Sequence, residues 1–105
     1  MFNGLLNYIS NKHNNENYDY HYDQIVSFGE IFSTVIISEY LNYIGIDNKW
    51  ADARKLICTD NIYRESNVNW DITEKNIKNY LSANNEKIII TQGFIGGTVD
   101  DKSTT

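Results

Sequence analysis

The residues best suited to bind a ligand lie on one stripe of a long apolar segment, residues 23–43. On a helix that turns by about 100° per residue, a carboxylate and three hydroxyl groups share a face: Ser27, Glu30, Thr34 and Ser38. The rest of the segment is largely aliphatic or aromatic, so the helix is expected to be buried. A buried carboxylate needs a cationic partner. Glu30 is interpreted either as the group that holds a ligand ammonium in a cleft or as a side chain at the helix edge that contacts water.

A second candidate is a glycine-containing turn that follows an aliphatic run. Residues Lys87 to Thr91 are mostly β-branched, which is typical of a central parallel strand covered by helices on both faces. Gln92 and then Gly93-Phe94-Ile95-Gly96-Gly97 follow directly. Glycines in such a turn let a ligand approach the backbone N–H groups, although they also occur in simple turns. The turn is not a P-loop, because no Lys-Ser or Lys-Thr follows at the required spacing.

Other polar residues have weaker patterns. Asp52 and Arg54 could line a site at a strand end with Asp60 and Arg64 nearby, but an internal ion pair between Asp52 and Arg54 is the favoured interpretation. No metal site is expected: the two histidines, His13 and His21, have no cysteine or carboxylate at ligand spacing, and both are expected to be solvated. Cys58, the single cysteine, has no histidine near it in sequence and is expected to be a packing residue.

Alternating helices and strands must position these residues. The periodicity and the helix-end signals predict the following elements: a short helix over Phe2–Asn11, a loop over Lys12–Tyr22, a helix from Asp23 to about Tyr43 ended by Gly45, a strand over Lys49–Ala53, a helical turn leading into a short strand over Lys55–Thr59, a helix from an Asp71 cap to Ser82, and a buried strand over Lys87–Thr91. This order predicts an α/β fold, in which ligands bind at the C-terminal ends of parallel strands.

The helix that starts near residue 71 carries its own signals. Asp71 and Glu74 have the spacing of a capping box, in which Asp71 would be the N-cap. Glu74 and Lys78 are spaced for an ion pair across one helical turn. The apolar residues of this helix, Trp70, Ile77 and Leu81, are predicted to form its buried stripe.

Composition excludes several functional classes. The 105 residues are enough for one domain, and 41% of them are hydrophobic, as in folded globular chains. A net charge of −5 with scattered basic residues argues against a nucleic-acid groove. No apolar run reaches the length of a membrane span, and a lone cysteine suits a reducing compartment. We therefore expect a cytoplasmic protein that binds neither nucleic acid nor membrane.

Taken together and in order, several segments resemble the motifs of aspartate kinases, which belong to the amino acid kinase superfamily. The resembling segments are Ser27-Phe28-Gly29-Glu30 with Ser33-Thr34 (S-x-G-E-x-x-S-T), Trp50-Ala51-Asp52-Ala53-Arg54 with Thr59-Asp60, Val68-Asn69-Trp70-Asp71, Thr91-Gln92-Gly93-Phe94-Ile95-Gly96 (T-x-G-F-I-G), and Lys102-Ser103-Thr104-Thr105. Each motif alone is weak, but their order and spacing together are specific.

The resemblance implies a fold, a reaction and a set of site residues. The fold would be part of a three-layer αβα sandwich of the carbamate kinase-like type, with a mostly parallel sheet. The reaction would be phosphorylation of the β-carboxylate of L-aspartate by ATP with Mg²⁺, which leads to lysine, threonine and methionine. The implied roles are ammonium binding by Glu30, contact with aspartate through the backbone of Phe94, a further substrate contact by Thr105, and support by Gly29, Ser33, Thr34, Gly93 and Gly96.

Important parts of the family pattern are missing from this sequence. The K-F-G-G strand with its phosphate-neutralising lysine, the arginine that pairs with the substrate α-carboxylate, and the nucleotide-binding half are all absent. Residues 1–105 are therefore expected to be one partial domain of a homo-oligomeric parent, with no catalytic residue of its own and no activity alone. The alternatives are a non-catalytic binding module of the same fold and a sister kinase that acts on glutamate or a carbamate.

Overall fold

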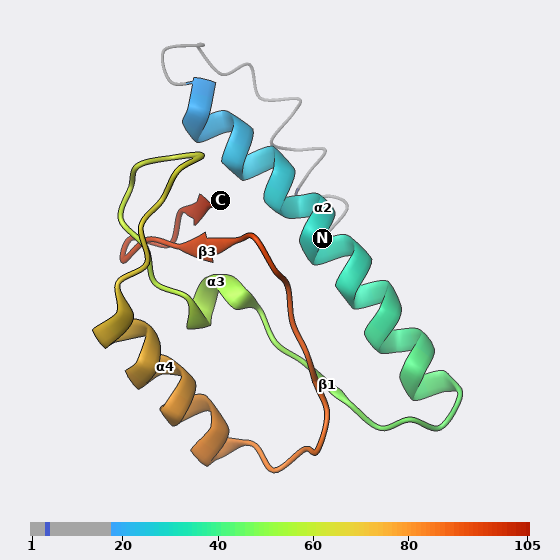
Figure 1. Cartoon of the computed structure of the whole chain (residues 1–105). Coiled ribbons are helices and arrows are strands. Elements are labelled where there is room, and N and C mark those ends of the chain that lie inside the picture. Colours follow the sequence, from blue (N-terminus) through green and yellow to red (C-terminus); the bar gives the residue numbers. More distant parts are fainter. Residues whose placement is uncertain (1–3, 5–17) are drawn as a thin grey trace.

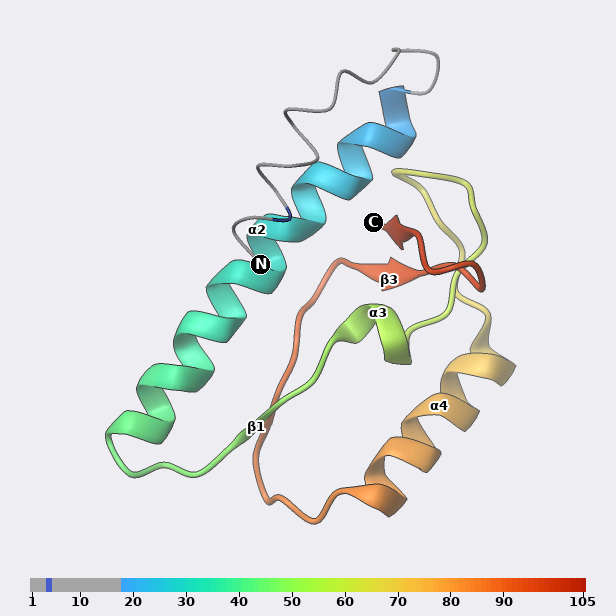
Figure 2. The ribbon, with the colours of Figure 1, turned by 180° about the vertical axis from the view of Figure 1, so that it is seen from behind.

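The structure is a computed structural model of the chain, and it describes Gly4 and residues 18–105. The described elements are α2 (Tyr18–Tyr43), β1 (Lys49–Trp50), α3 (Ala53–Leu56), α4 (Trp70–Ala83), β2 (Ile89–Ile90), β3 (Gly96–Gly97) and β4 (Ser103–Thr104). Helices α2 and α4 lie on opposite sides of the short strands (Figure 1), and the view from behind shows the same arrangement (Figure 2). The helix predicted over Phe2–Asn11 lies outside the described residues, apart from Gly4.

The described strands form two pairs of opposite kind. Strands β1 and β2 are parallel, with Lys49 opposite Ile89. Strands β3 and β4 form an antiparallel pair, and Cys58 adds a parallel bridge to Gly97 of β3. This arrangement agrees with the predicted α/β class. A three-layer sandwich with a mostly parallel sheet stays a prediction, because the described strands are too short and too few to test it.

Helix α2 begins earlier than predicted. It starts at Tyr18, so the prediction of a loop is wrong for residues 18–22, and Asp23 lies inside the helix and does not open it. Asp19 occupies the first turn, where a negative charge stabilises the N-terminal end of a helix. At the other end Gly45 has a φ of +90°, as predicted for the residue after a helix. Of the described helices, none is long and apolar enough to cross a membrane.

The buried side of α2 is polar, and this reverses the prediction that its aliphatic surface is covered. The buried residues of the helix are Asp23, Gln24, Ser27, Ile31 and Ser38. By contrast, the aliphatic side is open, and Ile36 and Ile37 are 58% and 49% exposed. The polar side packs inward because its side chains make hydrogen bonds to the rest of the chain, such as that from Ser38 Oγ to Asn48 Oδ1 at 2.5 Å.

Two of the three predicted strands are shorter in the structure, and the short strand expected before Thr59 is reduced to isolated bridges at Cys58 and Thr59. The strand expected over Lys49–Ala53 ends at Trp50, because the Asp52 side chain accepts a hydrogen bond from Arg54 N and caps α3. The predicted helical turn before Thr59 is confirmed as α3. The strand expected over Lys87–Thr91 is reduced to β2, whose residues are half-buried and not covered on both faces.

Helix α4 differs from its prediction at the cap and at the buried stripe. Asn69 is the N-cap, since its side chain accepts a hydrogen bond from Ile72 N, and Asp71 lies within the first turn. The predicted stripe is largely exposed, with Trp70 at 72% and Leu81 at 54%. The buried residue is Thr73, whose Oγ1 accepts a hydrogen bond from Cys58 N at 3.0 Å. The Glu74–Lys78 ion pair, at 2.8 Å, is confirmed.

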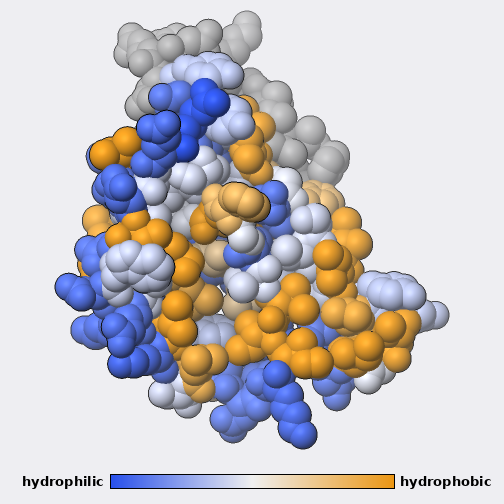
Figure 3. Space-filling model, in the orientation of Figure 1, coloured by the Kyte–Doolittle hydropathy of each residue, from blue (hydrophilic) through white to orange (hydrophobic). Residues whose placement is uncertain are grey.

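The hydrophobic core is small and lies between α2, α3 and the segment before β3. Ile31, Ala53 and Ile95 form it, with Val35 and Trp50 packed against it. Much of the remaining apolar surface is open: Figure 3 shows hydrophobic side chains gathered over the lower part of the molecule, where β1 and the C-terminal end of α2 lie. Open apolar surface of this extent marks an interface or an aggregation site.

We therefore expect the 105-residue chain to self-associate through its open apolar surface. Replacing Ile36, which is largely exposed on α2, with lysine should shift the sedimentation profile toward monomer, because a charge resists burial in an apolar contact. Ser33→Lys is the matched control, since Ser33 is exposed on the same helix and the change in charge is identical. A wild-type chain that sediments as a compact monomer with a cooperative thermal transition would contradict this expectation.

Candidate functional site

A groove of about 410 Å³ lies beside the turn that follows β2. Segments far apart in sequence line it: Ile57, Thr59, Ser66, Val68, Gln92, Gly93, Phe94, Ile95, Gly96, Thr104 and Thr105. The structure therefore brings together four of the residues singled out from the sequence, namely Gly93, Phe94, Gly96 and Thr105. The groove follows the C-terminal end of the parallel strand β2, the edge at which α/β folds bind ligands.

The turn offers unpaired backbone donors to this groove. Among the described residues, none accepts a hydrogen bond from the N–H of Gly93 or Phe94. Phe94 has a φ of +66°, and its side chain leaves the backbone open, because the residue is 92% exposed. Consecutive N–H groups in a turn can bind an anion. The geometry therefore suits a carboxylate at the backbone of this turn.

The three glycines predicted to support the site have different surroundings. A Cβ at Gly93 or Gly29 would meet no atom within 4 Å, so neither position is crowded by the protein itself. A Cβ at Gly96 would lie 2.8 Å from Thr59 Cγ2 and 2.9 Å from the Ile57 carbonyl oxygen. Gly96 is therefore needed for close packing of the groove wall, whereas the open space at the other two glycines leaves room beside the backbone.

Gln92 fixes the position of the turn, and sequence analysis did not give it a role. It is buried, and its Oε1 accepts a hydrogen bond from Ala53 N at 2.7 Å. Its Nε2 donates to Thr34 Oγ1 at 2.8 Å and to the Ala51 carbonyl at 3.2 Å. Thr34 also accepts from Trp50 Nε1 at 3.0 Å. One glutamine thus joins the turn to α2, to α3 and to Ala51 directly after β1, and its place after the predicted buried strand was the available signal.

Glu30 lies on α2, half-way along the polar stripe, and is not among the residues that line the groove. It is half-buried, and no described residue donates a hydrogen bond or forms an ion pair with its carboxylate. Thr34, one turn farther along α2, is bonded to Gln92 of the groove, whereas Asp23, two turns before Glu30 on the same stripe, is bonded to Thr105. Helix α2 and the chain leading to β3 run in opposite directions (Figures 1 and 2), and Glu30 lies on the stripe of α2 between the two residues that bond to the groove lining.

Ser33 has a more local role than the other residues of this helix motif. Its Oγ donates to the carbonyl oxygen of Glu30 at 3.2 Å, a bond within one helical turn. Ser33 is exposed and makes no contact with the groove lining. The structure therefore separates the two hydroxyl residues that the sequence grouped: Thr34 is tied to the turn through Gln92, and Ser33 is tied only to its own helix.

Two residues at the start of the polar stripe hold the C-terminal strand, and sequence analysis missed both. Gln24 donates from Nε2 to the Ser103 carbonyl at 2.7 Å and accepts from Ser103 N at 3.1 Å. Asp23 accepts from Thr105 N at 3.0 Å and from Thr105 Oγ1 at 2.7 Å. These bonds attach β4 and Thr105 to α2. Extending the stripe one turn toward the N-terminus would have included Asp23.

The loop over residues 60–67 forms another wall of the groove and is organised by Asp60. The side chain and backbone N–H of Asn67 and the N–H of Ile62 donate to its carboxylate. These hydrogen bonds, those from Asn67 above all, hold the pKa of Asp60 below its ordinary value. The loop also contacts the C-terminal residue, since Ser66 N donates to the Thr105 carbonyl at 3.2 Å.

Asp52 and Arg54 form the internal ion pair that the sequence favoured. Arg54 Nη2 lies 2.7 Å from Asp52 Oδ2, and Arg54 Nε also donates to the carboxylate. Burial alone would raise the pKa of Asp52, but the Arg54 hydrogen bonds and the charges of Arg54 and Lys55 together keep that pKa below its ordinary value. This pair fixes the start of α3 and is absent from the groove lining.

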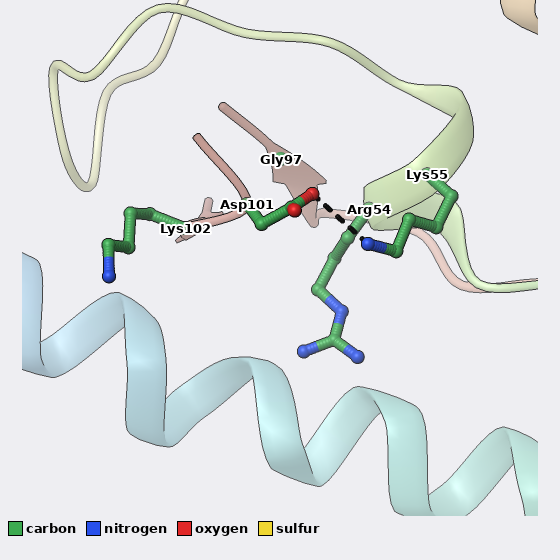
Figure 4. Close-up of a pocket in the computed structure, with 5 residues that line it drawn as sticks. All are labelled: Arg54, Lys55, Gly97, Asp101 and Lys102. Atoms are coloured by element: carbon green, nitrogen blue, oxygen red, sulfur yellow. Dashed lines mark hydrogen bonds and ion pairs between the residues drawn. The ribbon is translucent and has the colours of Figure 1, made fainter. Parts of the chain in front are cut away.

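A second, smaller hollow of about 130 Å³ is lined by Arg54, Lys55, Gly97, Asp101 and Lys102. Figure 4 shows Lys55 paired with Asp101, a contact of 3.0 Å, while Lys102 extends away from both toward α2. Arg54 is already bound to Asp52 and donates to Ser103 Oγ at 3.2 Å. Internal partners therefore occupy two of the three cations, and we assign no ligand to this hollow.

The remaining candidates from the sequence do not form a reactive site among the described residues. Cys58 is buried and free, as predicted for a packing residue. His21 is half-buried and meets the Tyr20 ring edge-on at a centroid distance of 5.1 Å, so its side chain is only partly solvated; His13 lies outside the described part of the chain. Within residues 18–105 and Gly4, no group of three or more His, Cys, Asp or Glu side chains could hold a metal ion.

Comparison with known proteins identifies the relatives of this chain. It is 32% identical over 84 residues to lysine-sensitive aspartokinase 3 of Escherichia coli (strain K12). The match covers 79% of this chain and 19% of that protein. It is 30% identical over 84 residues to the chloroplastic bifunctional aspartokinase/homoserine dehydrogenase 1 of Arabidopsis thaliana, covering 79% of this chain and 9% of the relative. The chain thus spans about a fifth or less of the length of these relatives.

Solved structures agree with the sequence comparison, and the resemblance to aspartate kinases is confirmed. E. coli aspartokinase III in complex with aspartate and ADP (R-state) matches with a TM-score of 0.75 and 31% identity, over 83% of this chain and 20% of that one. The complex of the same enzyme with lysine and aspartate (T-state) gives 0.77 and 30%, with the same coverage of both chains. A model of the amino acid kinase family matches residues 3–104. The chain therefore belongs to the amino acid kinase family.

Proposed function

We propose that this chain is the aspartate-binding part of an aspartate kinase, which phosphorylates the β-carboxylate of L-aspartate to 4-phospho-L-aspartate in lysine, threonine and methionine biosynthesis. One observation carries the proposal: a half-buried carboxylate without a described partner, Glu30, lies on α2 between two residues that bond to the lining of a groove, and the turn of that groove has unpaired N–H groups at Gly93 and Phe94. A zwitterionic amino acid carries the two complementary charges, an ammonium and a carboxylate.

In this proposal, Glu30 binds the substrate ammonium, and the backbone of Phe94 donates to a substrate carboxylate. Partial burial of Glu30 strengthens its interaction with the ammonium, because charges attract more strongly where less water surrounds them. Gln92 keeps the turn at a fixed distance from α2 through Thr34, so the two charged ends of the substrate meet partners whose separation is set by the fold. Such pre-positioning is the contribution that a binding half makes to phosphoryl transfer.

The nucleotide and its metal do not fit the described residues. The described residues hold no carboxylate cluster that could bind Mg²⁺. Two of the three cations of the second hollow are engaged, Arg54 with Asp52 and Lys55 with Asp101. We therefore propose that ATP and Mg²⁺ bind outside this part of the chain, and that the residues described here bind and orient aspartate without performing the transfer.

The proposal predicts that the 105-residue chain alone forms no aspartyl hydroxamate above background when supplied with ATP, Mg²⁺ and L-aspartate, because it lacks the cations that stabilise phosphoryl transfer. A chimera should be active: E. coli lysine-sensitive aspartokinase 3 in which the segment that matches this chain is replaced by the corresponding residues of this chain. The measurement is the hydroxamate rate of both proteins at saturating ATP.

The control is the same E. coli enzyme with the matching segment deleted, which should be inactive. A chimera that is folded by circular dichroism and binds ADP, yet phosphorylates no L-aspartate, would contradict the proposal. Phosphorylation of L-glutamate in its place would assign the chain to a sister kinase. Activity of the 105 residues alone would show that the transfer machinery lies within them.

A further inference from the structure

Asp23 is a fully buried carboxylate that connects two walls of the groove. Its exposed fraction is 0%. Oδ2 accepts a hydrogen bond from Arg64 N at 2.8 Å and another from Thr105 N at 3.0 Å, while Oδ1 accepts from Thr105 Oγ1 at 2.7 Å. Arg64 belongs to the loop over residues 60–67, and Thr105 lines the groove. One side chain on α2 therefore holds together two segments that are distant in sequence.

The chemistry of this contact is unusual for a purely structural bond. A buried charge is costly unless it is well paired, yet all three donors to Asp23 are neutral groups: two backbone N–H groups and one hydroxyl. Arg64 approaches with its backbone in the left-handed region, at a φ of +70°, while its guanidinium lies 4.1 Å from the centroid of the Tyr22 ring. The loop therefore presents the backbone N–H of Arg64, and not its guanidinium, to the Asp23 carboxylate.

The Asp23 bond also sets what Thr105 can offer to a ligand. An ionised carboxylate only accepts hydrogen bonds, so the Thr105 hydroxyl must use its single hydrogen on Asp23. The oxygen of that hydroxyl can then still accept a hydrogen bond, but the hydroxyl has no hydrogen left to donate. A ligand group beside it must be a donor, such as the ammonium of an amino acid, and a ligand carboxylate there would be repelled. Strand β4 does not depend on Asp23 for its position, because Gln24 holds Ser103 by two further bonds.

We propose that Asp23 is a positioning residue for the substrate site: it fixes the spacing between the loop over residues 60–67 and Thr105, and it orients the Thr105 hydroxyl as an acceptor for the substrate ammonium. This inference rests on the proposed function for the identity of the ligand. The connection between the two walls rests only on the contacts of Asp23, and it can be tested in the chain by itself.

The first test is residue-resolved amide hydrogen exchange, measured by NMR on the 105-residue chain. Asp23→Ala removes both carboxylate oxygens, so the N–H groups of Arg64 and Thr105, which both donate to Oδ2, lose their acceptor. We expect the amides of Arg64 and Thr105 to exchange at least about tenfold faster, as a lost buried bond of about 1.4 kcal/mol requires. The Thr73 amide in α4, bonded to Asn69, should be unchanged.

Asp19→Ala is the matched control, because it makes the same change on the same helix at an exposed aspartate that meets Arg64 only through its side chain, at 3.4 Å. Unchanged exchange at Arg64 and Thr105 in Asp23→Ala would overturn the inference. If Asp23→Ala also exposes the Thr73 amide, the chain has unfolded, and Thr105→Val decides: it removes the hydroxyl bond to Asp23 and should accelerate exchange of the amide at residue 105 alone. No acceleration in that variant would equally overturn it.

The second test separates positioning from stability in the chimera defined above. Asp23→Asn should raise the KM for aspartate about tenfold, since small displacements of binding groups have effects of this size or larger, and should leave the KM for ATP unchanged. Thr105→Ser keeps the hydroxyl and should retain the wild-type KM, whereas Thr105→Val should not. A fall in the melting temperature without a change in the aspartate KM would reduce Asp23 to a structural residue. An inactive parent chimera would count against the proposed function, while the exchange experiment would still decide on Asp23.

Discussion

Gly97→Ala is expected to destabilise the 105-residue chain by about 3 kcal/mol, toward the upper end of the cost of overpacking. A Cβ at Gly97 would overlap the carbonyl oxygen of Arg54 and lie 3.2 Å from its carbonyl carbon. The obstructing atoms belong to the backbone of α3, which cannot rotate away as a side chain can. Gly97 is also held in place from both sides, since its N–H donates to Ile57 and its carbonyl accepts from Thr59, each at 2.9 Å. The strain would therefore separate α3 from β3.

Equilibrium unfolding in urea measures this effect, with Gly93→Ala as the matched control. Both substitutions add one methyl group to a glycine of the same turn region, but a Cβ at Gly93 meets no atom within 4 Å. Gly93→Ala should therefore leave the midpoint nearly unchanged, whereas Gly97→Ala should lower it strongly. Equal midpoints for the two variants would show that α3 and β3 are not packed as closely as the structure places them.

The local structure was largely predictable from the sequence because its signals are local. The periodicity of α2, the glycine after its end and the ion pair between Asp52 and Arg54 each depend on neighbours within a few residues. The prediction failed where two local signals competed. Asn69 and Asp71 are both good N-caps, and only the contact of the Asn69 side chain with Ile72 N decides between them.

The burial of the helices could not be predicted from hydrophobicity alone. The aliphatic side of α2 and the residues Trp70 and Leu81 of α4 were expected inside, yet they are exposed. A hydrophobic side faces inward only where something covers it, and the described residues provide only the small core around Ile31. The polar stripe of α2 packs inward because hydrogen bonds to Gln92 and Thr105 satisfy it.

The site was predictable only in part, because some of its contacts join residues that are far apart in sequence. The turn at Gly93 and Phe94 was predicted from its glycines after an aliphatic run, Thr105 entered through the aspartate kinase resemblance, and the groove brings all three together. Asp23 and Gln24 were missed because their partners lie 82 and 79 residues away in sequence. A polar residue whose function depends on such distant contacts has no periodic or local signature. The one available signal was the continuation of the hydroxyl stripe by one more turn.

Glu30→Gln in the chimera is expected to raise the KM for aspartate at least about tenfold while leaving the KM for ATP unchanged. The substitution keeps the shape of the side chain and removes its charge, so the substrate ammonium loses its counter-ion in a partly desolvated groove. Losing one member of such a pair costs about 2–5 kcal/mol, and each 1.4 kcal/mol corresponds to about a factor of ten. The protein itself loses little, since no described residue is bonded to the Glu30 carboxylate.

The same change at Glu39 is the control, because Glu39 is an exposed glutamate of α2 that lies on the opposite side of the helix from the polar stripe. Glu39→Gln should alter neither KM, so any shared effect of charge removal on the helix is subtracted. Melting temperatures of both variants complete the comparison. A lower melting temperature for Glu30→Gln with an unchanged aspartate KM would make Glu30 a residue of the helix edge, and the ammonium of the substrate would then need another partner. A raised aspartate KM at an unchanged melting temperature has no explanation in stability, and with Glu39→Gln unaffected it would assign the effect to the Glu30 carboxylate.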